Sequence, residues 1–353
     1  MGLFSFDVIP KTYVGIDVGS SALRVVEIAG WGDRRTLKNY GELRIRTLYD
    51  KPFRSFEKNA LLLSTHDIAR AIRGIIEETG IKEKNAIFSI SDYSSFFTDF
   101  ELPPMDEKEL PDAVRFEARR HVPLPLSEVV LDWQLVEKRK KKQDPFRVLL
   151  VAVPKEVIHH YEEIARLAKL KLVVIEPEVF GGIRVHLKEE KYPAVLMDIG
   201  SHTTTVSIVY KGLLRMSHSI DTGGNSFTER VARAFSLNYD EAEEKKQAEG
   251  MNIVSGNVRI LVPVADAMLL ETKKLLENFK RQEPSEVRKI VLSGGAASLK
   301  GLDAYLERQT RLKTEIIQPF GNILYPPILE SKFTKEGPLY AVAVGMALRG
   351  FEQ

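Results

Sequence analysis

The sequence contains no cysteine and no long apolar run. Without cysteine there is no disulfide framework, thiolate nucleophile, zinc cage or iron–sulfur site, and a reducing compartment fits. One of the longest uninterrupted apolar stretches, 148–153, ends at Pro154, far short of the roughly 20 residues of a spanning helix. The first residues show neither a signal peptide nor a myristoylation motif, because Phe6 stands where Ser or Thr is needed. We therefore expect a cytoplasmic protein with no lipid or helical anchor of its own.

Neither sign of charge predominates, with 51 Lys and Arg against 49 Asp and Glu and a net charge of +2. No field of the whole molecule would steer the chain onto nucleic acid or anionic lipid. The one basic run, 138–142, lies between two predicted strands, 129–135 and 146–153. No aromatic residue interleaves it, so we interpret it as the solvated tip of a hairpin and not as a nucleic-acid site. A chain of 353 residues predicts two domains or four smaller lobes.

One pattern occurs twice along the chain. Residues 13–28 form a predicted hairpin with a break after Asp17, and residues 194–209 repeat it after Asp198. The aspartates are 198 − 17 = 181 positions apart, about half the chain, which indicates a duplicated half and not a short solenoid repeat.

Each copy leads an aspartate into a Gly-Ser turn, a pattern typical of phosphate binding. Glycine lets backbone N–H groups approach phosphate oxygens, and the hydroxyls beside it donate further hydrogen bonds. The predicted phosphate-binding residues are Gly19, Ser20, Ser21, Gly200, Ser201, Thr203 and Thr204. A carboxylate beside triphosphate would repel it unless Mg²⁺ lies between them, so we expect Asp17 and Asp198 to face the metal or its waters.

Two features of the second half are candidates for binding the base and ribose. The turn Gly294, Gly295, Ala296 follows a predicted buried strand and offers bare backbone. On a predicted helix, Glu243 and Lys246 share one face and supply an acceptor and a donor. Taken singly, the glycine turn is typical of an ordinary strand-to-helix turn, and the Glu/Lys pair is typical of an ordinary solvated ion pair.

Together these motifs resemble the actin-like ATPases, the superfamily of actin, FtsA, sugar kinases and the large heat-shock chaperones. The resemblance spans nearly the whole chain and implies an α/β fold of two halves around an ATP cleft. The predicted divisions are 1–96 plus 151–190 for the first actin-like half, 97–150 for an inserted subdomain, 191–235 plus 290–353 for the second half, and 236–289 for a helical subdomain beside the nucleotide.

Within that superfamily the chain is most similar to the PilM family of type IV pilus assembly. Residues 15–27 follow the family pattern G-I-D-[IV]-G-S-S-x-[IL]-[KR]-V-V-E, and 109–133 carry the Glu-Ala pair, Pro-x-Pro and acidic residue of its FtsA/PilM-type insert. Gly223 and Gly224, with Thr228, fit the family's helices near the nucleotide. The resemblance implies that ATP and Mg²⁺ bind at the residues named above. His202 departs from it, because a small residue is common at this place in the second phosphate turn.

The resemblance also implies a partner. That partner is PilN-like, an inner-membrane protein whose short cytoplasmic N-terminal segment docks in a groove between the first half and the insert. Helix 109–121 and strand 129–136 would form the groove wall, and the chain would sit at the membrane only through this partner. A homo-oligomer is left open.

Turnover requires a polar residue that orients water toward the γ-phosphate. Glu176 is the catalytic candidate, because 175–178 begin the predicted helix between the halves much as N-E-P begins it in the heat-shock ATPases. The equal alternative is a carboxylate favoured by the helix dipole. We expect a nucleotide-gated scaffold with slow ATP hydrolysis.

Two other functions compete with this interpretation. An FtsA-like, filament-forming division protein would carry a C-terminal amphipathic helix, for which the end of this sequence leaves no room. A small-molecule kinase would need a polar substrate pocket, whereas the insert offers proline, apolar and basic residues.

Overall fold

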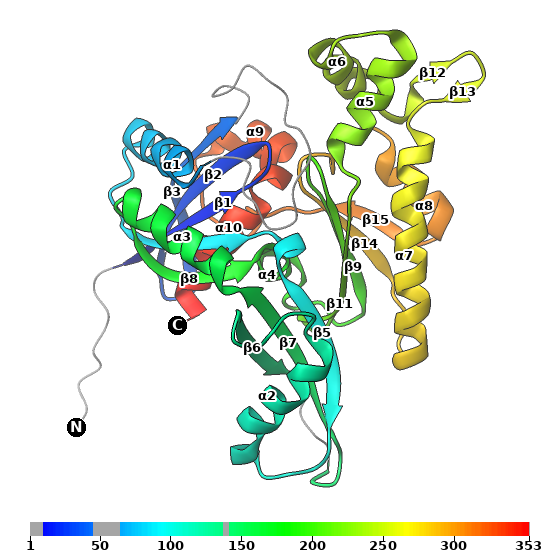
Figure 1. Ribbon diagram of the computed structural model, residues 1–353. Coiled ribbons are helices and arrows are strands. Elements are labelled where there is room, and N and C mark those ends of the chain that lie inside the picture. The colour runs from blue at the N-terminus through cyan, green and yellow to red at the C-terminus, as the bar shows by residue number, and fades with distance from the viewer. Residues whose placement is uncertain (1–9, 45–63, 137–140, 353) are drawn as a thin grey trace.

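The computed structural model describes residues 10–44, 64–136 and 141–352 (Figure 1). The signal-peptide and myristoylation expectations lie outside these ranges. Most of the basic run 138–142 also lies outside these ranges. Its last two residues, Lys141 and Lys142, are described and are exposed. None of the helices in the described ranges is both long and apolar enough to cross a membrane.

Two five-stranded sheets share one strand plan, which confirms the duplicated fold. The first has the order β3-β2-β1-β4-β8 and the second β11-β10-β9-β14-β15. In each, a three-stranded antiparallel meander is extended by two parallel strands. The strands of the first sheet are β1 (Lys11–Val18), β2 (Ala22–Trp31), β3 (Arg34–Arg44), β4 (Asn85–Ile90) and β8 (Lys171–Pro177). Those of the second are β9 (Ala194–Ile199), β10 (Thr204–Tyr210), β11 (Leu213–Ile220), β14 (Lys289–Ser293) and β15 (Lys313–Ile316).

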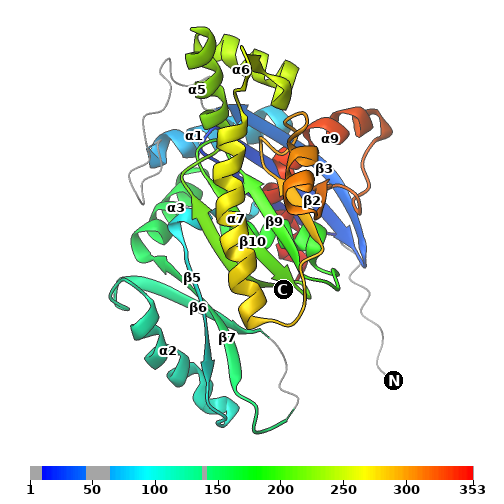
Figure 2. The same ribbon diagram turned by 90° about the vertical axis from the view of Figure 1, so that its right-hand side faces the viewer.

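Amphipathic helices cover the outer faces of the two sheets. Helices α1 (Thr65–Thr79) and α3 (Lys155–Leu167) pack against the first sheet in one apolar core. Ser64 caps α1 by accepting a hydrogen bond from the Asp67 N–H at 3.2 Å. Helices α7 (Val262–Gln282) and α8 (Leu302–Thr310) belong to the core of the second sheet, and α7 runs along its face in Figure 2.

The chain returns to the first half at its end. Helix α10 (Ala341–Arg349) lies between the sheets with the short helix α4 (Glu178–Gly182), and it packs against β1. The contact is so close that a Cβ on Gly15 would lie 1.9 Å from the Ala343 carbonyl oxygen. The division of the sequence assigned 290–353 to the second half, whereas the structure places α10 against the first sheet. Helix α9 (Glu330–Glu336) precedes it.

The insert forms a separate lobe that projects from the two halves (Figures 1 and 2). Its sheet has the order β5-β7-β6, with β5 (Phe96–Leu102), β6 (Val129–Leu135) and β7 (Phe146–Pro154), and α2 (Leu110–His121) covers one face. An ionic cluster ties the insert to the second half, because Arg147 binds Asp99 at 2.8 Å and Glu283 at 2.6 Å, and Arg215 also binds Glu283.

A small lobe of helices lies at the opposite end from the insert (Figure 1). It consists of α5 (Gly224–Phe235), α6 (Tyr239–Glu249) and a hairpin of β12 (Val254–Ser255) and β13 (Val258–Arg259). Asn238 caps α6 through a hydrogen bond from the Glu241 N–H at 3.0 Å. This lobe brings α6 to the edge of the cleft.

Candidate functional site

A cavity of about 360 Å³ lies between the two halves. The turns after β1, β9 and β14 line it, together with the start of α5 and residues of α6. Three of these segments follow the carboxyl ends of strands, where open α/β sheets bind their ligands.

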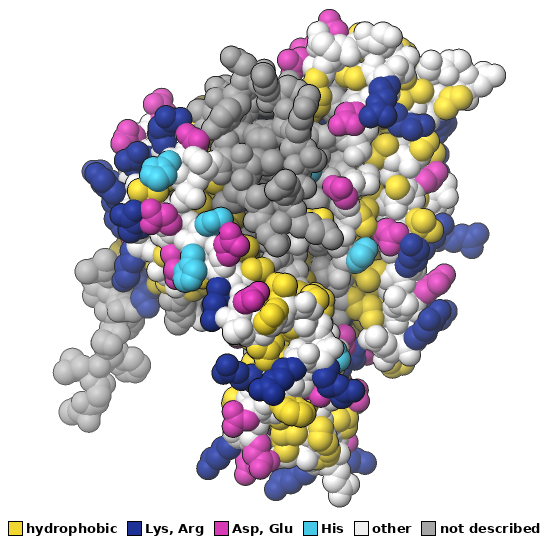
Figure 3. All heavy atoms as spheres, in the orientation of Figure 1, with side chains coloured by type: hydrophobic (Ala, Val, Ile, Leu, Met, Phe, Trp, Pro, Cys, Tyr) yellow, Lys and Arg dark blue, Asp and Glu magenta, His cyan; other side chains and the backbone are white. Residues whose placement is uncertain are grey.

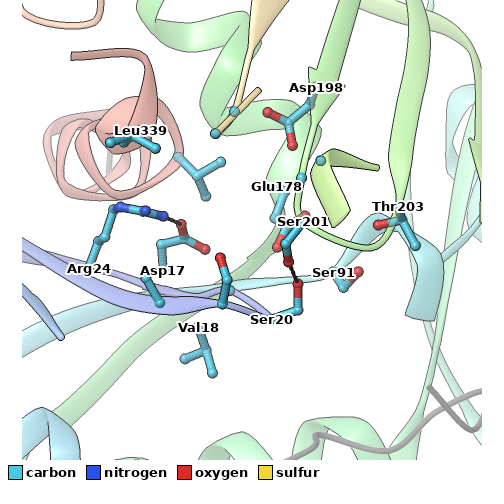
Figure 4. A pocket seen from close by; sticks show the side chains of 18 of the residues that line it. Asp17, Val18, Ser20, Arg24, Ser91, Glu178, Asp198, Ser201, Thr203 and Leu339 are labelled. Carbon is cyan, nitrogen blue, oxygen red and sulfur yellow. Dashed lines mark hydrogen bonds and ion pairs between the residues drawn. The ribbon is translucent and has the colours of Figure 1, made fainter. Parts of the chain in front are cut away.

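The two predicted phosphate turns face each other across this cavity. Ser20 Oγ and Ser201 Oγ form a hydrogen bond of 2.5 Å between them (Figure 4). Helix α5 begins directly on the second turn, because the N–H groups of Gly224 and Asn225 donate to the carbonyls of Gly200 and Ser201 at 2.8 Å. The duplicated motif therefore forms one site with two opposed walls.

Most of the predicted cofactor residues line this cavity, and two do not. Gly223 packs closely against the backbone of the second turn, because a Cβ on it would lie 2.7 Å from two carbonyl oxygens of that turn. Thr204 is buried, and its hydroxyl donates a hydrogen bond to the Thr222 carbonyl at 2.7 Å. The next residue, Thr205, lines the cavity in its place. The predicted residues that do line it are Asp17, Gly19, Ser20, Ser21, Asp198, Gly200, Ser201, Thr203, Gly224, Glu243, Lys246, Gly294, Gly295 and Ala296.

Asp17 and Asp198 stand at the same place in the two duplicated strands. Asp17 is 6% exposed and accepts a hydrogen bond from Ser89 Oγ at 3.1 Å. Burial raises the pKa of Asp17 to about 6, although Arg24 opposes this. Burial also raises the pKa of Asp198, whose buried Oδ1 has no hydrogen-bond partner in the described part of the chain. The positive charge of Arg24 acts on both carboxylates but only partly offsets the effect of their burial.

Glu178 brings a further carboxylate to the cavity from the first turn of α4. Burial raises the pKa of Glu178 well above its ordinary value, and the charges of Asp17, Asp92 and Asp198 add to the effect. Among the described residues, no three acidic or imidazole side chains converge as a direct metal cage. The arrangement therefore suits a cation that keeps part of its water shell and completes its coordination with a ligand.

The predicted pair on α6 lies at the cavity, where Lys246 also donates to the Gly224 carbonyl at 3.3 Å. Lys246 Nζ binds Glu243 Oε2 at 2.6 Å, and Thr228 Oγ1 donates to the same oxygen at 2.5 Å. Burial lowers the pKa of Lys246, while Lys246 holds the pKa of Glu243 below its ordinary value against the effect of burial. The pair is thus a buried, hydrogen-bonded unit at the cleft and not a solvated surface pair.

Glu176 does not lie where the sequence placed it. Residues 175–177 end strand β8, and the helix begins only at Glu178. The Glu176 carboxylate turns away from the cavity and accepts two hydrogen bonds of 2.9 Å from Arg184. The strand ends at Pro177, and the change of direction into α4 brings the Glu178 carboxylate to the cavity instead.

Other residues of the site were missed from the sequence. Arg24 lies 3.9 Å from Asp17 and 2.9 Å from Glu42, and both it and Glu42 line the cavity. Tyr239 lines it too and donates to Asn225 Oδ1 at 2.6 Å. Only the placement of Arg24 on the strand after the first turn was visible beforehand. His202 contacts Ser201 Oγ through Nδ1 at 3.1 Å, and burial lowers its pKa.

The comparison with protein families decides what this architecture is. Residues 15–351 match the family described as type IV pilus assembly protein PilM. The chain belongs to the PilM family. This confirms the resemblance drawn from residues 15–27 and 109–133.

Solved structures and curated relatives agree with this family and its actin-like ATPase fold. A PilM–PilN type IV pilus biogenesis complex matches at 26% identity with a TM-score of 0.82, covering 97% of this chain and 99% of that chain. MreB5 of Spiroplasma citri bound to AMPPNP matches at 14% identity with a TM-score of 0.53, covering 97% and 96%. The cell division protein FtsA of Agrobacterium fabrum is 22% identical over 56% of this chain and 50% of its own length. The chain spans about half the length of the curated FtsA relatives that it matches first. The actin-like ATPase fold of its structural neighbours implies nucleotide binding.

Proposed function

We propose that this chain is an ATP-binding scaffold of type IV pilus assembly that docks a segment of a PilN-like inner-membrane protein. The observation that carries the proposal is the meeting of the two phosphate turns at Ser20 and Ser201 across one cavity. The similar PilM structure was solved as a complex with PilN. The chain would then work on the cytoplasmic side, held at the membrane through that partner.

ATP and Mg²⁺ fit the residues of this cavity. Asp198 Oδ1 is buried without a partner, and a Cβ on Gly294 would lie 2.9 Å from it, so glycine keeps this space open. Asp17 and Asp198 are the oxygen ligands that Mg²⁺ or its waters prefer. The Gly19 and Gly200 turns would bind the phosphates, and Glu243 and Lys246 would meet the ribose or base. Mg²⁺ would supply the charge that lets carboxylates and phosphates share the cleft.

Glu178 is our candidate for orienting water during slow hydrolysis. It lines the cavity with Asp17 and Asp198, and burial raises its pKa well above the ordinary value, which favours a group that takes up a proton. Glu176, bound to Arg184, serves instead to hold β8 to the helix that follows.

The insert offers the docking surface for the partner segment. Strand β6 pairs only with β7 among the described strands, so its other edge is available for an added extended strand. Val130 on β6 is 45% exposed, and Figure 3 shows apolar side chains among Lys and Arg on this lobe. Helix α2 and β6 would form the wall of the groove, as the resemblance implied.

A titration of the partner segment tests the scaffold and its nucleotide dependence together. The probe is a synthetic peptide of the cytoplasmic N-terminal segment of the PilN-like protein from the same genome, titrated with and without Mg-ATP. Because linkage is reciprocal, we expect coupling of about 1–3 kcal/mol. Val130→Arg should abolish peptide binding, whereas Val254→Arg, at a similarly exposed position (52%) in the distant hairpin, should not. Unchanged peptide affinity in Val130→Arg would reject the β6 edge, and equal affinities with and without Mg-ATP would reject the nucleotide gate.

The FtsA-like alternative has weaker support, since the FtsA relatives match only part of the chain, at 21% to 28% identity. Filament formation with Mg-ATP but no peptide binding would favour it.

A further inference from the structure

His202 is the residue of the second turn that the proposed function does not use. It stands four positions after Asp198, where the first copy of the motif has Ser21 four positions after Asp17. Ser21 lines the cavity, whereas His202 does not line it but contacts Ser201, which does. The two copies of the turn therefore differ at the residue next to their meeting point.

Hydrogen bonds join His202 to both walls of the cleft. Its Nδ1 lies 3.1 Å from Ser201 Oγ, and Ser201 Oγ lies 2.5 Å from Ser20 Oγ of the first half (Figure 4). Its Nε2 lies 3.3 Å from Asn225 Nδ2, and the Tyr239 hydroxyl donates to Asn225 Oδ1 at 2.6 Å. One chain of hydrogen bonds therefore runs from α6, through the start of α5, to the first phosphate turn.

The donors and acceptors fix the direction of this chain. The side-chain oxygen of Asn225 accepts from Tyr239, so its amide N–H faces His202 and makes Nε2 an acceptor. A neutral imidazole then carries its proton on Nδ1, which donates to Ser201 Oγ. Burial favours the neutral ring, because it lowers the pKa of His202. The Ser201 hydroxyl is left to donate its own proton across the cleft.

A hydroxyl held in this direction suits a phosphate group between the two turns. In this structure the acceptor of the Ser201 proton is Ser20 Oγ. A phosphate oxygen can replace it, and a hydrogen bond to an ionised group contributes more than one to a neutral hydroxyl. Hydrogen bonds in a chain also polarise and strengthen one another. His202 would thus act on the ligand through Ser201.

We propose that His202 is a positioning residue for nucleotide binding, which holds the Ser201 hydroxyl as a donor to phosphate and links it to α6. This inference rests on the proposed function, because it needs phosphate between the two turns. It goes further in giving the residue that departs from the family pattern a role in nucleotide affinity. It also connects the phosphates to the lobe of α5 and α6 by hydrogen bonds.

Calorimetry of Mg-ATP binding to the full chain, at about pH 8 where the ring is neutral, tests the contact with Ser201. His202→Ala removes the donor and should weaken Mg-ATP binding about tenfold. His202→Asn supplies an amide N–H at the position of Nδ1 and should restore the affinity to within about threefold of the wild type. His159→Ala, at an exposed position on α3, is the control and should bind Mg-ATP with unchanged affinity. A His202→Asn variant as weak as His202→Ala would reject the proposal, because a ring that only fills space predicts this result.

A double-mutant cycle tests the link to α6. Tyr239→Phe removes the first donor of the chain and should weaken Mg-ATP binding about threefold in the wild type, but not in His202→Ala. An equal effect in both backgrounds would show that Tyr239 contacts the nucleotide itself, and the proposal would be rejected. Wild-type affinity in His202→Ala would also reject it while leaving the proposed function intact. A wild-type chain that binds no Mg-ATP would overturn the proposed function and this inference with it, so the two failures are distinguishable.

Discussion

Replacing Asp17 by Asn should make the chain more stable while removing its Mg-nucleotide site. Asp17 is 6% exposed, and burial raises its pKa from 3.8 to about 6. Ser89 donates to its Oδ1 at 3.1 Å, a bond that the asparagine oxygen can still accept. Only the longer contact of 3.9 Å between Arg24 and Oδ2 loses its charge. The substitution therefore removes a buried charge with little change in packing.

The sign and size of the effect follow from proton linkage. The folded chain holds the Asp17 proton more tightly than the unfolded chain, so its contribution to stability falls as pH rises from 3.8 through about 6. A shift of about 2 pKa units corresponds to about 3 kcal/mol. Near pH 8, Asp17→Asn should thus raise the free energy of unfolding by up to about 3 kcal/mol. Below about pH 4 both chains carry a neutral side chain, and the difference should vanish.

Urea unfolding across this pH range, in EDTA and without nucleotide, measures the difference. Asp112→Asn, at an exposed position in the first turn of α2, is the control and should lower the free energy of unfolding near pH 8 by no more than about 1 kcal/mol. Saturating Mg-ATP should then stabilise the wild type by about 2.7 kcal/mol at 100 times its Kd, but not Asp17→Asn. A variant that is less stable than the wild type near pH 8 would refute the reasoning, because attraction to Arg24 would then outweigh the cost of burial.

Three further substitutions probe other parts of the site. Gly223→Ala places a Cβ 2.7 Å from two carbonyl oxygens of the second turn. Calorimetry should therefore show at least a roughly tenfold loss of Mg-ATP affinity. The control is Gly74→Ala, which adds a Cβ in open space on α1 and should bind Mg-ATP with unchanged affinity. Glu178→Gln should slow single-turnover phosphate release about 10²-fold, and an equal loss in Glu176→Gln would contradict our assignment. Glu283→Gln removes the carboxylate that binds both Arg147 and Arg215. Urea unfolding should show that the free energy of unfolding falls by about 3 kcal/mol. An unchanged unfolding midpoint would mean that this cluster does not hold the insert.

The duplicated turns were predictable because their signal is local. A strand, an aspartate, a glycine and a hydroxyl within five positions define one turn, and its repetition after 181 residues defines the other. Glycine and β-branched residues restrict the backbone wherever they occur. Most residues of both turns that line the cavity were therefore identified in advance. Val18 and Ala22 were not, and Thr205 lines the cavity in place of Thr204.

Glu176 shows why the catalytic candidate was misplaced. The sequence alone does not say whether 175–177 continue a strand or begin a helix, and pairing with β4 makes them a strand. With the strand continued to Pro177, the Glu176 carboxylate binds Arg184, and the helix begins two residues later at Glu178. The register of β8 against its neighbour is a property of the folded sheet and not of the segment.

The sequence by itself determined the duplicated α/β halves, the paired Asp-x-Gly-Ser turns and the family, because these depend on residue types at short spacing. Tertiary structure alone decided that α10 returns to the first sheet, that Asp92 and Glu178 join the aspartates of the two turns, and that Arg147 and Arg215 meet at Glu283. These contacts join segments distant in sequence, and packing of the whole chain brings them together. No local preference of the backbone encodes which buried carboxylates will share one low-dielectric space.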